Sequence, residues 1–117
     1  MLTYDDYVTM GGDVARADFA PLEARAARRL DSATFGRLRE ERPLRACARM
    51  CLAELIDLYA EEAEASGRRV VEQQNGDLRV RYADAGAWDA RRDGAVIRLW
   101  LEDEADGEGT PLLYCGQ

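Results

Sequence analysis

The sequence contains no lysine and no histidine, and all 16 of its basic residues are arginines. Without histidine, no side chain has an unperturbed pKa near neutrality; without lysine, no amine can act as a Schiff-base nucleophile. Glycine-rich phosphate loops, nucleophile elbows and the HExxH zinc motif are also missing. These absences argue against an enzyme, and we expect neither catalytic residues nor a cofactor.

Long apolar runs are absent too, since none approaches the ~20 residues that a helix needs to span a bilayer. The N-terminal sequence MLTYDDY is acidic where a signal peptide would be basic, which predicts a cytoplasmic protein without a membrane partner. The 3 cysteines include no CxxC pair, and this favours free thiols in a reducing compartment.

Cys47 and Cys51 lie four residues apart and would share one face of a helix. They could form half of a metal or redox site, or they could be two small side chains of the core. We favour the core, because free cysteine behaves as a small buried apolar residue and no histidine completes a zinc site. We therefore expect no bound metal.

The chain has 117 residues, of which 47% are apolar and 33% charged, as is typical of one globular domain. Its net charge of −7 argues against nucleic-acid binding by bulk electrostatics. Residues 25–49 oppose this trend, with eight arginines against three acids. These residues could bind nucleic acid, contact an acidic patch on a neighbouring subunit, or simply be solvated. Of the two functional alternatives we favour the subunit contact, because the whole chain is acidic and arginine pairs with carboxylates in a bidentate manner. The interface candidates are Arg25, Arg28 and Arg29, and the acidic candidates are Glu61, Glu62, Glu64 and residues 102–108.

Apolar residues recur every three or four positions along most of the chain, which predicts a mainly α fold. Thr3 is expected to cap the first helix and Gly11-Gly12 to end it, while Asp18 is expected to cap the second. Ser66-Gly67 is expected to end the third helix, whose apolar stripe is the widest. That stripe contains Leu44, Cys47, Ala48, Cys51, Leu52, Leu55, Ile56, Tyr59 and Ala63. The predicted helices cover residues 3–10, 18–35, 43–66 and 86–101.

Two segments are not clearly helical. Residues 78–82 alternate apolar and charged side chains, and Asn75-Gly76 is a strong turn signal, so we predict a β-hairpin over residues 70–82. Residues 96–101 are compatible with a helix or a strand, and we favour a helix. The prediction is therefore one domain over residues 1–117, a small bundle of about four helices with one hairpin between the third and fourth, and a tail over 102–117.

The tail begins with an acidic run, which should be a solvated loop, and ends in an apolar cluster. Leu112, Leu113 and Tyr114 either fold back onto the core or bind a partner. Tyrosine suits an interface because its ring is apolar and its hydroxyl is polar.

Several short motifs, in this order and spacing, resemble the head–tail connector family of tailed phages. Members of this family are small adaptor or head-completion proteins that lie beneath the portal. Each motif is weak alone, because no position performs chemistry that would fix its identity. The motifs are Thr3-Tyr4-x-x-Tyr7 with Gly11-Gly12, Phe19-x-x-Leu22, Ala26-x-x-x-Leu30-Asp31-x-x-Thr34-Phe35, Val70-Val71-x-x-x-Asn75-Gly76-Asp77-x-x-Val80-x-Tyr82, and Leu112-Leu113-Tyr114-x-Gly116.

The resemblance implies a structural subunit, encoded by a phage or prophage, that forms a ring of about twelve copies on the portal and extends the DNA channel. Expected partners are further copies of the chain, the portal protein and a downstream head-completion or tail protein. DNA would pass through without sequence-specific binding. The expected locations are the bacterial host cytoplasm and the virion, at the head–tail interface.

Within this resemblance, the hairpin with Tyr82 would contact a neighbouring subunit or narrow the channel. Leu112, Leu113 and Tyr114 would bind the portal. The alternative is a small dimeric helical module that binds or regulates another protein.

Overall fold

The computed structural model of the chain describes residues 1–72 and 91–114. Its helices are α1 (Tyr4–Thr9), α2 (Arg16–Ala33) and α3 (Ala46–Glu72). The chain is also helical over residues 91–101, which we call the C-terminal helix. The prediction of a mainly α fold is therefore confirmed.

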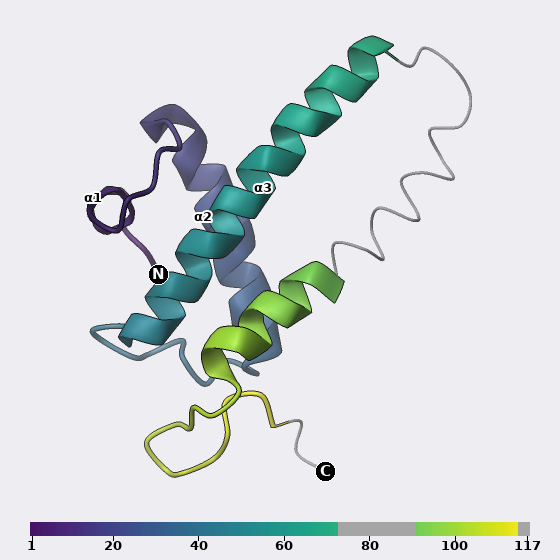
Figure 1. Cartoon of the computed structure of the whole chain (residues 1–117). Helices are drawn as coiled ribbons and strands as arrows, with labels where there is room; N and C mark the ends of the chain where they lie inside the picture. The colour runs from purple at the N-terminus through teal and green to yellow at the C-terminus, as the bar shows by residue number, and fades with distance from the viewer. Residues whose placement is uncertain (73–90, 115–117) are drawn as a thin grey trace.

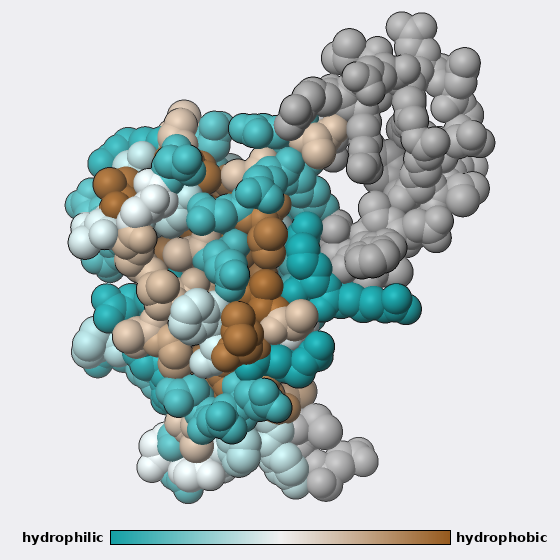
Figure 2. Space-filling model, in the orientation of Figure 1, coloured by the Kyte–Doolittle hydropathy of each residue, from teal (hydrophilic) through white to brown (hydrophobic). Residues whose placement is uncertain are grey.

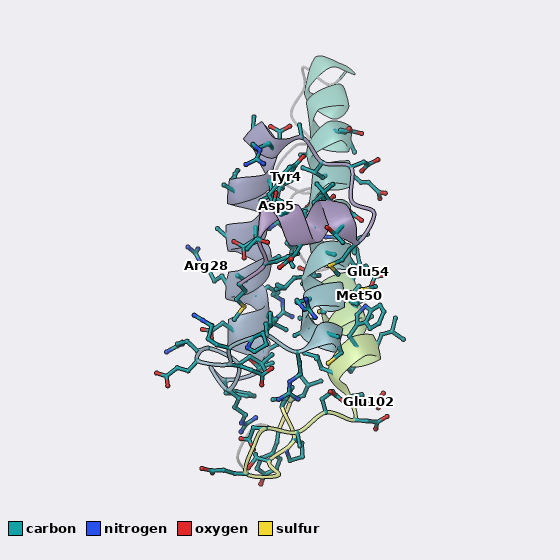
Figure 3. The ribbon with its side chains drawn as sticks, turned by 90° about the vertical axis from the view of Figure 1, so that its left-hand side faces the viewer. Tyr4, Asp5, Arg28, Met50, Glu54 and Glu102 are labelled. Carbon is teal, nitrogen blue, oxygen red and sulfur yellow. The ribbon has the colours of Figure 1, made fainter. Side chains whose placement is uncertain are left out.

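Helix α3 is the axis of the molecule, and α2 packs along it. The C-terminal helix lies beside the lower half of α3, while the upper part of α3 extends beyond the other helices (Figures 1 and 3). The residues buried between these helices form one cluster. They include Tyr7, Phe19, Leu30, Leu38, Leu52, Leu55, Ile56, Tyr59, Ile97, Leu101 and Leu112.

Helix α1 begins and ends at the predicted signals. The hydroxyl of Thr3 accepts a hydrogen bond of 3.1 Å from the backbone N–H of Asp6. At the other end, the N–H of Gly11 bonds to the carbonyl of Val8 and the N–H of Gly12 to that of Tyr7, each at 3.0 Å. Gly11 has a φ of 97°, which is unfavourable for any residue with a Cβ. This pair of bonds is a Schellman motif, and it turns the chain back over the ring of Tyr7.

Helix α2 starts two residues before the predicted cap Asp18, with Ala15 at the N-cap position and no side-chain cap. Its C-terminus repeats the geometry of α1, since the N–H of Gly36 bonds to the carbonyl of Asp31 at 3.0 Å. Phe35 and Gly36 are both left-handed here, with φ values of 55° and 74°. The turn that ends α2 thus begins at a residue with a side chain and is completed by a glycine.

Helix α3 differs from its prediction at both ends. It begins at Ala46 and not at residue 43, because the carboxylate of Glu41 accepts the backbone N–H of Arg45 at 2.9 Å and so fixes the entry to the first turn. It continues through Ser66-Gly67, the predicted stop, to Glu72. A single glycine costs a helix only about 1 kcal/mol relative to alanine, which does not stop a helix that is already propagating.

The predicted β-hairpin over residues 70–82 is wrong in its first strand. Val70 and Val71 lie in the last turn of α3, and the described residues contain no strand. The β-branched side chains favour a strand only weakly, and here helix propagation outweighs that preference. Residues 73–82, with the Asn75-Gly76 turn and Tyr82, lie outside the described residues.

The ambiguous segment 96–101 is helical, with Ile97 and Leu101 buried in the core. After it, Ala105 and Pro111 form an isolated antiparallel bridge, and Asp106 caps the turn between them. The acidic run is therefore partly ordered against the bundle and is not a simple solvated loop. In the part of the chain that the structure describes, no helix has both the length and the apolar character needed to cross a membrane.

Candidate functional site

Arg25, the first interface candidate, is engaged within the chain. Its guanidinium lies 3.9 Å from the ring centre of Tyr59 and forms an ion pair of 3.1 Å with Glu62. Glu62 also lies 3.7 Å from Arg92 of the C-terminal helix. Arg25 thus ties α2 to α3, and its main contact is internal.

Arg28 and Arg29 are placed differently. Arg28 is exposed, and neither residue forms a hydrogen bond or an ion pair within residues 1–72 and 91–114. A Cβ built on Gly94 would lie 3.4 Å from Nη1 of Arg98 and 4.0 Å from Nη2 of Arg29. Gly94 therefore lies near guanidinium groups of both α2 and the C-terminal helix. We call Arg28, Arg29 and Arg98 the basic face.

The other arginines of residues 25–49 mostly bind groups of their own chain. Arg39 forms a bidentate pair with Asp31, with its shorter bond at 2.7 Å. Arg42 donates to backbone carbonyls, and Arg45 pairs with Glu41 at 2.7 Å and with the carbonyl of Ala105 at 2.8 Å. Arg49 is an exception, because its Nε is buried without a hydrogen-bond partner among the described residues. The local excess of positive charge is otherwise largely paired inside the fold.

The pair between Arg45 and Glu41 predicts how stability depends on pH. Hydrogen bonds from Arg45 lower the pKa of Glu41 below its ordinary value of 4.5. A carboxyl with a lowered pKa stabilises the fold above its unfolded pKa, and this contribution is lost as the pH falls through the folded value. Glu41→Gln should therefore lower the Tm at about pH 7, and the difference from wild type should shrink towards about pH 3. Thermal melts measure it, with Glu40→Gln on the exposed neighbour as control. A difference that does not change with pH would contradict this assignment.

The C-terminal apolar cluster folds back onto the core, which decides between the two alternatives for Leu112. Leu112 is fully buried, and Leu113 packs against the core from its edge. One nitrogen of Arg37 donates to the carbonyls of Pro111, Leu112 and Tyr114 at 3.0, 3.0 and 2.6 Å. Of the three candidates, only Tyr114 keeps a large exposed fraction, 45%. Tyr82, the remaining candidate, lies outside the described residues.

The two helical cysteines have different surroundings. Cys51 is fully buried among the apolar residues of α3, and burial raises the pKa of its thiol to about 12. Cys47 is half-buried, and burial followed by a hydrogen bond to Glu104 raises the pKa of its thiol to about 11. Both thiols are therefore protonated at neutral pH. The described residues hold no group of three or more side chains suited to a metal ion.

Two polar pairs, one buried and one part-buried, connect the helices and were not expected from the sequence. The hydroxyl of Tyr59 donates to Asp93 at 2.6 Å, and that carboxylate, which is only 5% exposed, also accepts from Arg92. The hydroxyl of Tyr7 donates to Asp57 of α3. Burial, followed by these carboxylate contacts, raises the pKa of both phenols. A signal existed for Asp93, which lies four and eight residues before the buried Ile97 and Leu101 and hence on the core face of its helix.

Figure 2 shows a strip of apolar surface on one face of the molecule. In α3 and the C-terminal helix, the apolar side chains that keep some exposure include Met50, Leu58, Val96 and Trp100, and Leu99 is 72% exposed. The indole N–H of Trp100 donates to Glu54 at 2.7 Å, which places both residues where the two helices meet. We call this surface the apolar–acidic face. It consists of the apolar residues Met50, Leu99 and Trp100 and the nearby acids Glu54, Glu102 and Asp103.

No family model, curated protein or solved structure matches the chain. The two faces and the contacts within the fold are therefore the observations on which a function can be built.

Gly94 gives a test of the packing beneath the basic face. It is helical, and a methyl group there would make ordinary contacts with the ends of Arg98 and Arg29. Gly94→Ala should therefore stabilise the protein by about 0.5–1 kcal/mol, because alanine loses less backbone entropy in a helix. The expected rise in Tm is about 2–5 °C. The control is Gly107→Ala. Gly107 has open space around it but lies in a turn and not in a helix, so alanine should not raise the Tm there. A fall in Tm for Gly94→Ala would mean that the two helices cannot accommodate the methyl group.

Proposed function

We propose that the chain is a structural subunit of a phage or prophage head–tail connector. It self-associates into a ring that binds the portal and extends the DNA channel. The observation that carries the proposal is that several motif residues, among them Tyr7, Phe19 and Leu112, lie in the core of this fold, while Phe35 is 56% exposed.

The first motifs assemble the N-terminal half. Thr3 caps α1, and Tyr7 packs against Phe19 with their ring centres 5.3 Å apart. Gly11 and Gly12 form the turn that covers the Tyr7 ring. Each of these residues has a structural role in the N-terminal half of the fold, and this supports reading their ordered spacing as a likeness of architecture.

The later motifs close the bundle. Leu30 and Thr34 are buried, and the Thr34 hydroxyl donates to the carbonyl of Leu30 at 2.9 Å. Asp31 holds Arg39, while Leu112 lies in the core. The connector motifs thus support the helical core from both ends of the chain.

The mechanism is one of shape and self-association, without a reacting group. An acidic protein suits a channel wall, because a strongly basic wall would hold the phosphate backbone of passing DNA by releasing its counterions. The basic residues are instead available for contacts between proteins.

Native mass spectrometry of the chain mixed with the portal protein encoded beside it tests the proposal. A complex with one ring of chains on each portal ring supports it, as would neighbouring genes for a portal, a capsid protein and a tail protein. A stable dimer that forms nothing larger when the portal is present would instead favour the alternative, a dimeric binding module.

A further inference from the structure

The C-terminal helix has one exposed side, and this side carries both charge signs. Its exposed residues are spaced three or four positions apart, so they form a single stripe along the helix. In chain order they are Arg91, Ala95, Arg98, Leu99 and Glu102. Leu99 is a large apolar side chain and yet 72% exposed. The stripe therefore holds an exposed leucine with basic residues before it and an acid after it.

The acidic end of the stripe is poorly matched by its own helix. Arg98 and Glu102 lie one turn apart, but the bond that joins them is between backbone atoms, from the N–H of Glu102 to the carbonyl of Arg98 at 2.9 Å. An arginine four residues before an acid is the less favourable order for a side-chain pair within a helix. Glu102 and Asp103 also directly follow the last helical residue, Leu101, where the partial negative charge of the helix favours cations. A cation from outside the helix would suit this end better.

We infer that the C-terminal helices of two copies pack against each other through this stripe, in antiparallel directions. An antiparallel arrangement places the basic end of each stripe beside the acidic end of the other, whereas a parallel one places like charges together. The register with Arg91 opposite Glu102 also brings Leu99 of each copy beside Ala95 of the other. Ala95 carries only a methyl group and so leaves room for the leucine. The same stripe is used on both copies, so the contact is isologous and forms a symmetric dimer.

A second copy fits this stripe better than a nucleic acid does. The chain has a net charge of −7, and Glu102 lies only one turn from Arg98, so a phosphate backbone is repelled both by the whole molecule and by the stripe itself. The stripe instead matches a helix that presents an acid, an apolar side chain and a base in the reverse direction, which a second copy supplies. The inference concerns the chain without a portal, so it goes beyond the proposed function and does not depend on it.

Sedimentation velocity tests the pair at chain concentrations of about 10 μM to 1 mM, a range that suits a small contact of one helix per copy. An ionic strength of about 0.15 M, with a screening length of about 8 Å, weakens the repulsion between two acidic chains more than it weakens charge pairs in contact. The variants are Arg91→Glu, Glu102→Arg and Leu99→Ala. All three side chains are exposed, so each variant should remain folded, and thermal melts check this.

The expected result is that wild type forms a dimer and nothing larger. Each variant should dimerise at least about tenfold more weakly, because the symmetry places every changed side chain in the contact twice. An equimolar mixture of Arg91→Glu and Glu102→Arg should regain the dimer, since both charge pairs of the mixed dimer join opposite signs. A chain that carries these two substitutions together should regain it as well.

Matched controls make the same changes elsewhere on the surface. Arg28→Glu lies on the opposite side of the molecule from Glu102 (Figure 3), Glu64→Arg changes an exposed acid of α3, and Val8→Ala trims an exposed apolar residue of α1. Each control should dimerise like wild type. The inference is wrong if wild type stays monomeric throughout, if it assembles beyond a dimer, if the mixture does not recover, or if a control loses as much as its matched variant.

The portal experiment separates this inference from the proposed function. If wild type is monomeric alone but forms rings on the portal, the symmetric pair is wrong and the connector role stands. If the reversed variants rescue each other but no ring forms on the portal, the symmetric pair is right and the connector role fails.

Discussion

Replacing Gly12 with alanine is expected to destabilise the protein by about 3 kcal/mol or more. A Cβ at this position would overlap Cζ, Cε1 and Cε2 of the Tyr7 ring, closer than the 3.0 Å that Cβ atoms avoid. The ring cannot easily yield, because it is fully buried, packs against Phe19, donates to Asp57 and accepts the N–H of Val14. Either the turn after α1 or the Tyr7 side chain must move, and both are parts of the core.

Urea denaturation of Gly12→Ala measures this loss, and two further variants show its cause. Gly107→Ala, with no atom within 4 Å of its Cβ, should leave the free energy of unfolding nearly unchanged. In a Tyr7→Leu background the overlapping ring atoms are gone, and Gly12→Ala should then cost less than about 1 kcal/mol. If the alanine is equally costly in both backgrounds, the loss comes from the backbone of the turn and not from the ring.

The sequence predicted those parts of the fold that depend on local interactions. Thr3 and Gly11-Gly12 act within a few residues of themselves, and their cap and stop are present in the structure. The apolar stripe of α3 was equally clear, and Ala48, Cys51, Leu52, Leu55, Ile56 and Tyr59 are all buried. A helix with one wide apolar side can bury that side against the rest of the protein in only one orientation.

The errors arose where a local signal competed with a longer-range effect. Val70-Val71 with Asn75-Gly76 indicates a hairpin when taken alone, but α3 extends through Val71. For Arg25 and Arg37, the charge could be predicted from the sequence but the partner could not. Their partners, Tyr59 with Glu62 and the carbonyls near Leu112, lie more than 30 residues away and are brought close only by folding. Arg28 and Arg29 lie in the segment that the charge pattern singled out, whereas Arg98 was not among the predicted residues.

Replacing Asp93 with alanine should lower the free energy of unfolding by about 2–4 kcal/mol. The carboxylate is the acceptor for the hydroxyl of Tyr59, which is only 1% exposed, and it also pairs with Arg92 at 3.2 Å. Its loss leaves a buried hydroxyl without an acceptor and removes a link between α3 and the C-terminal helix. Tyr59→Phe should cost less, about 1–2 kcal/mol, because Arg92 still satisfies the carboxylate.

A double-mutant cycle in urea distinguishes this pair from independent effects. With both groups removed, no buried hydroxyl is left unsatisfied, so Asp93→Ala with Tyr59→Phe should cost at least about 1 kcal/mol less than the two single changes together. Arg91→Gln, at the exposed neighbour of Arg92, is the matched control and should change stability only slightly. Strictly additive losses would show that Tyr59 and Asp93 stabilise the bundle separately.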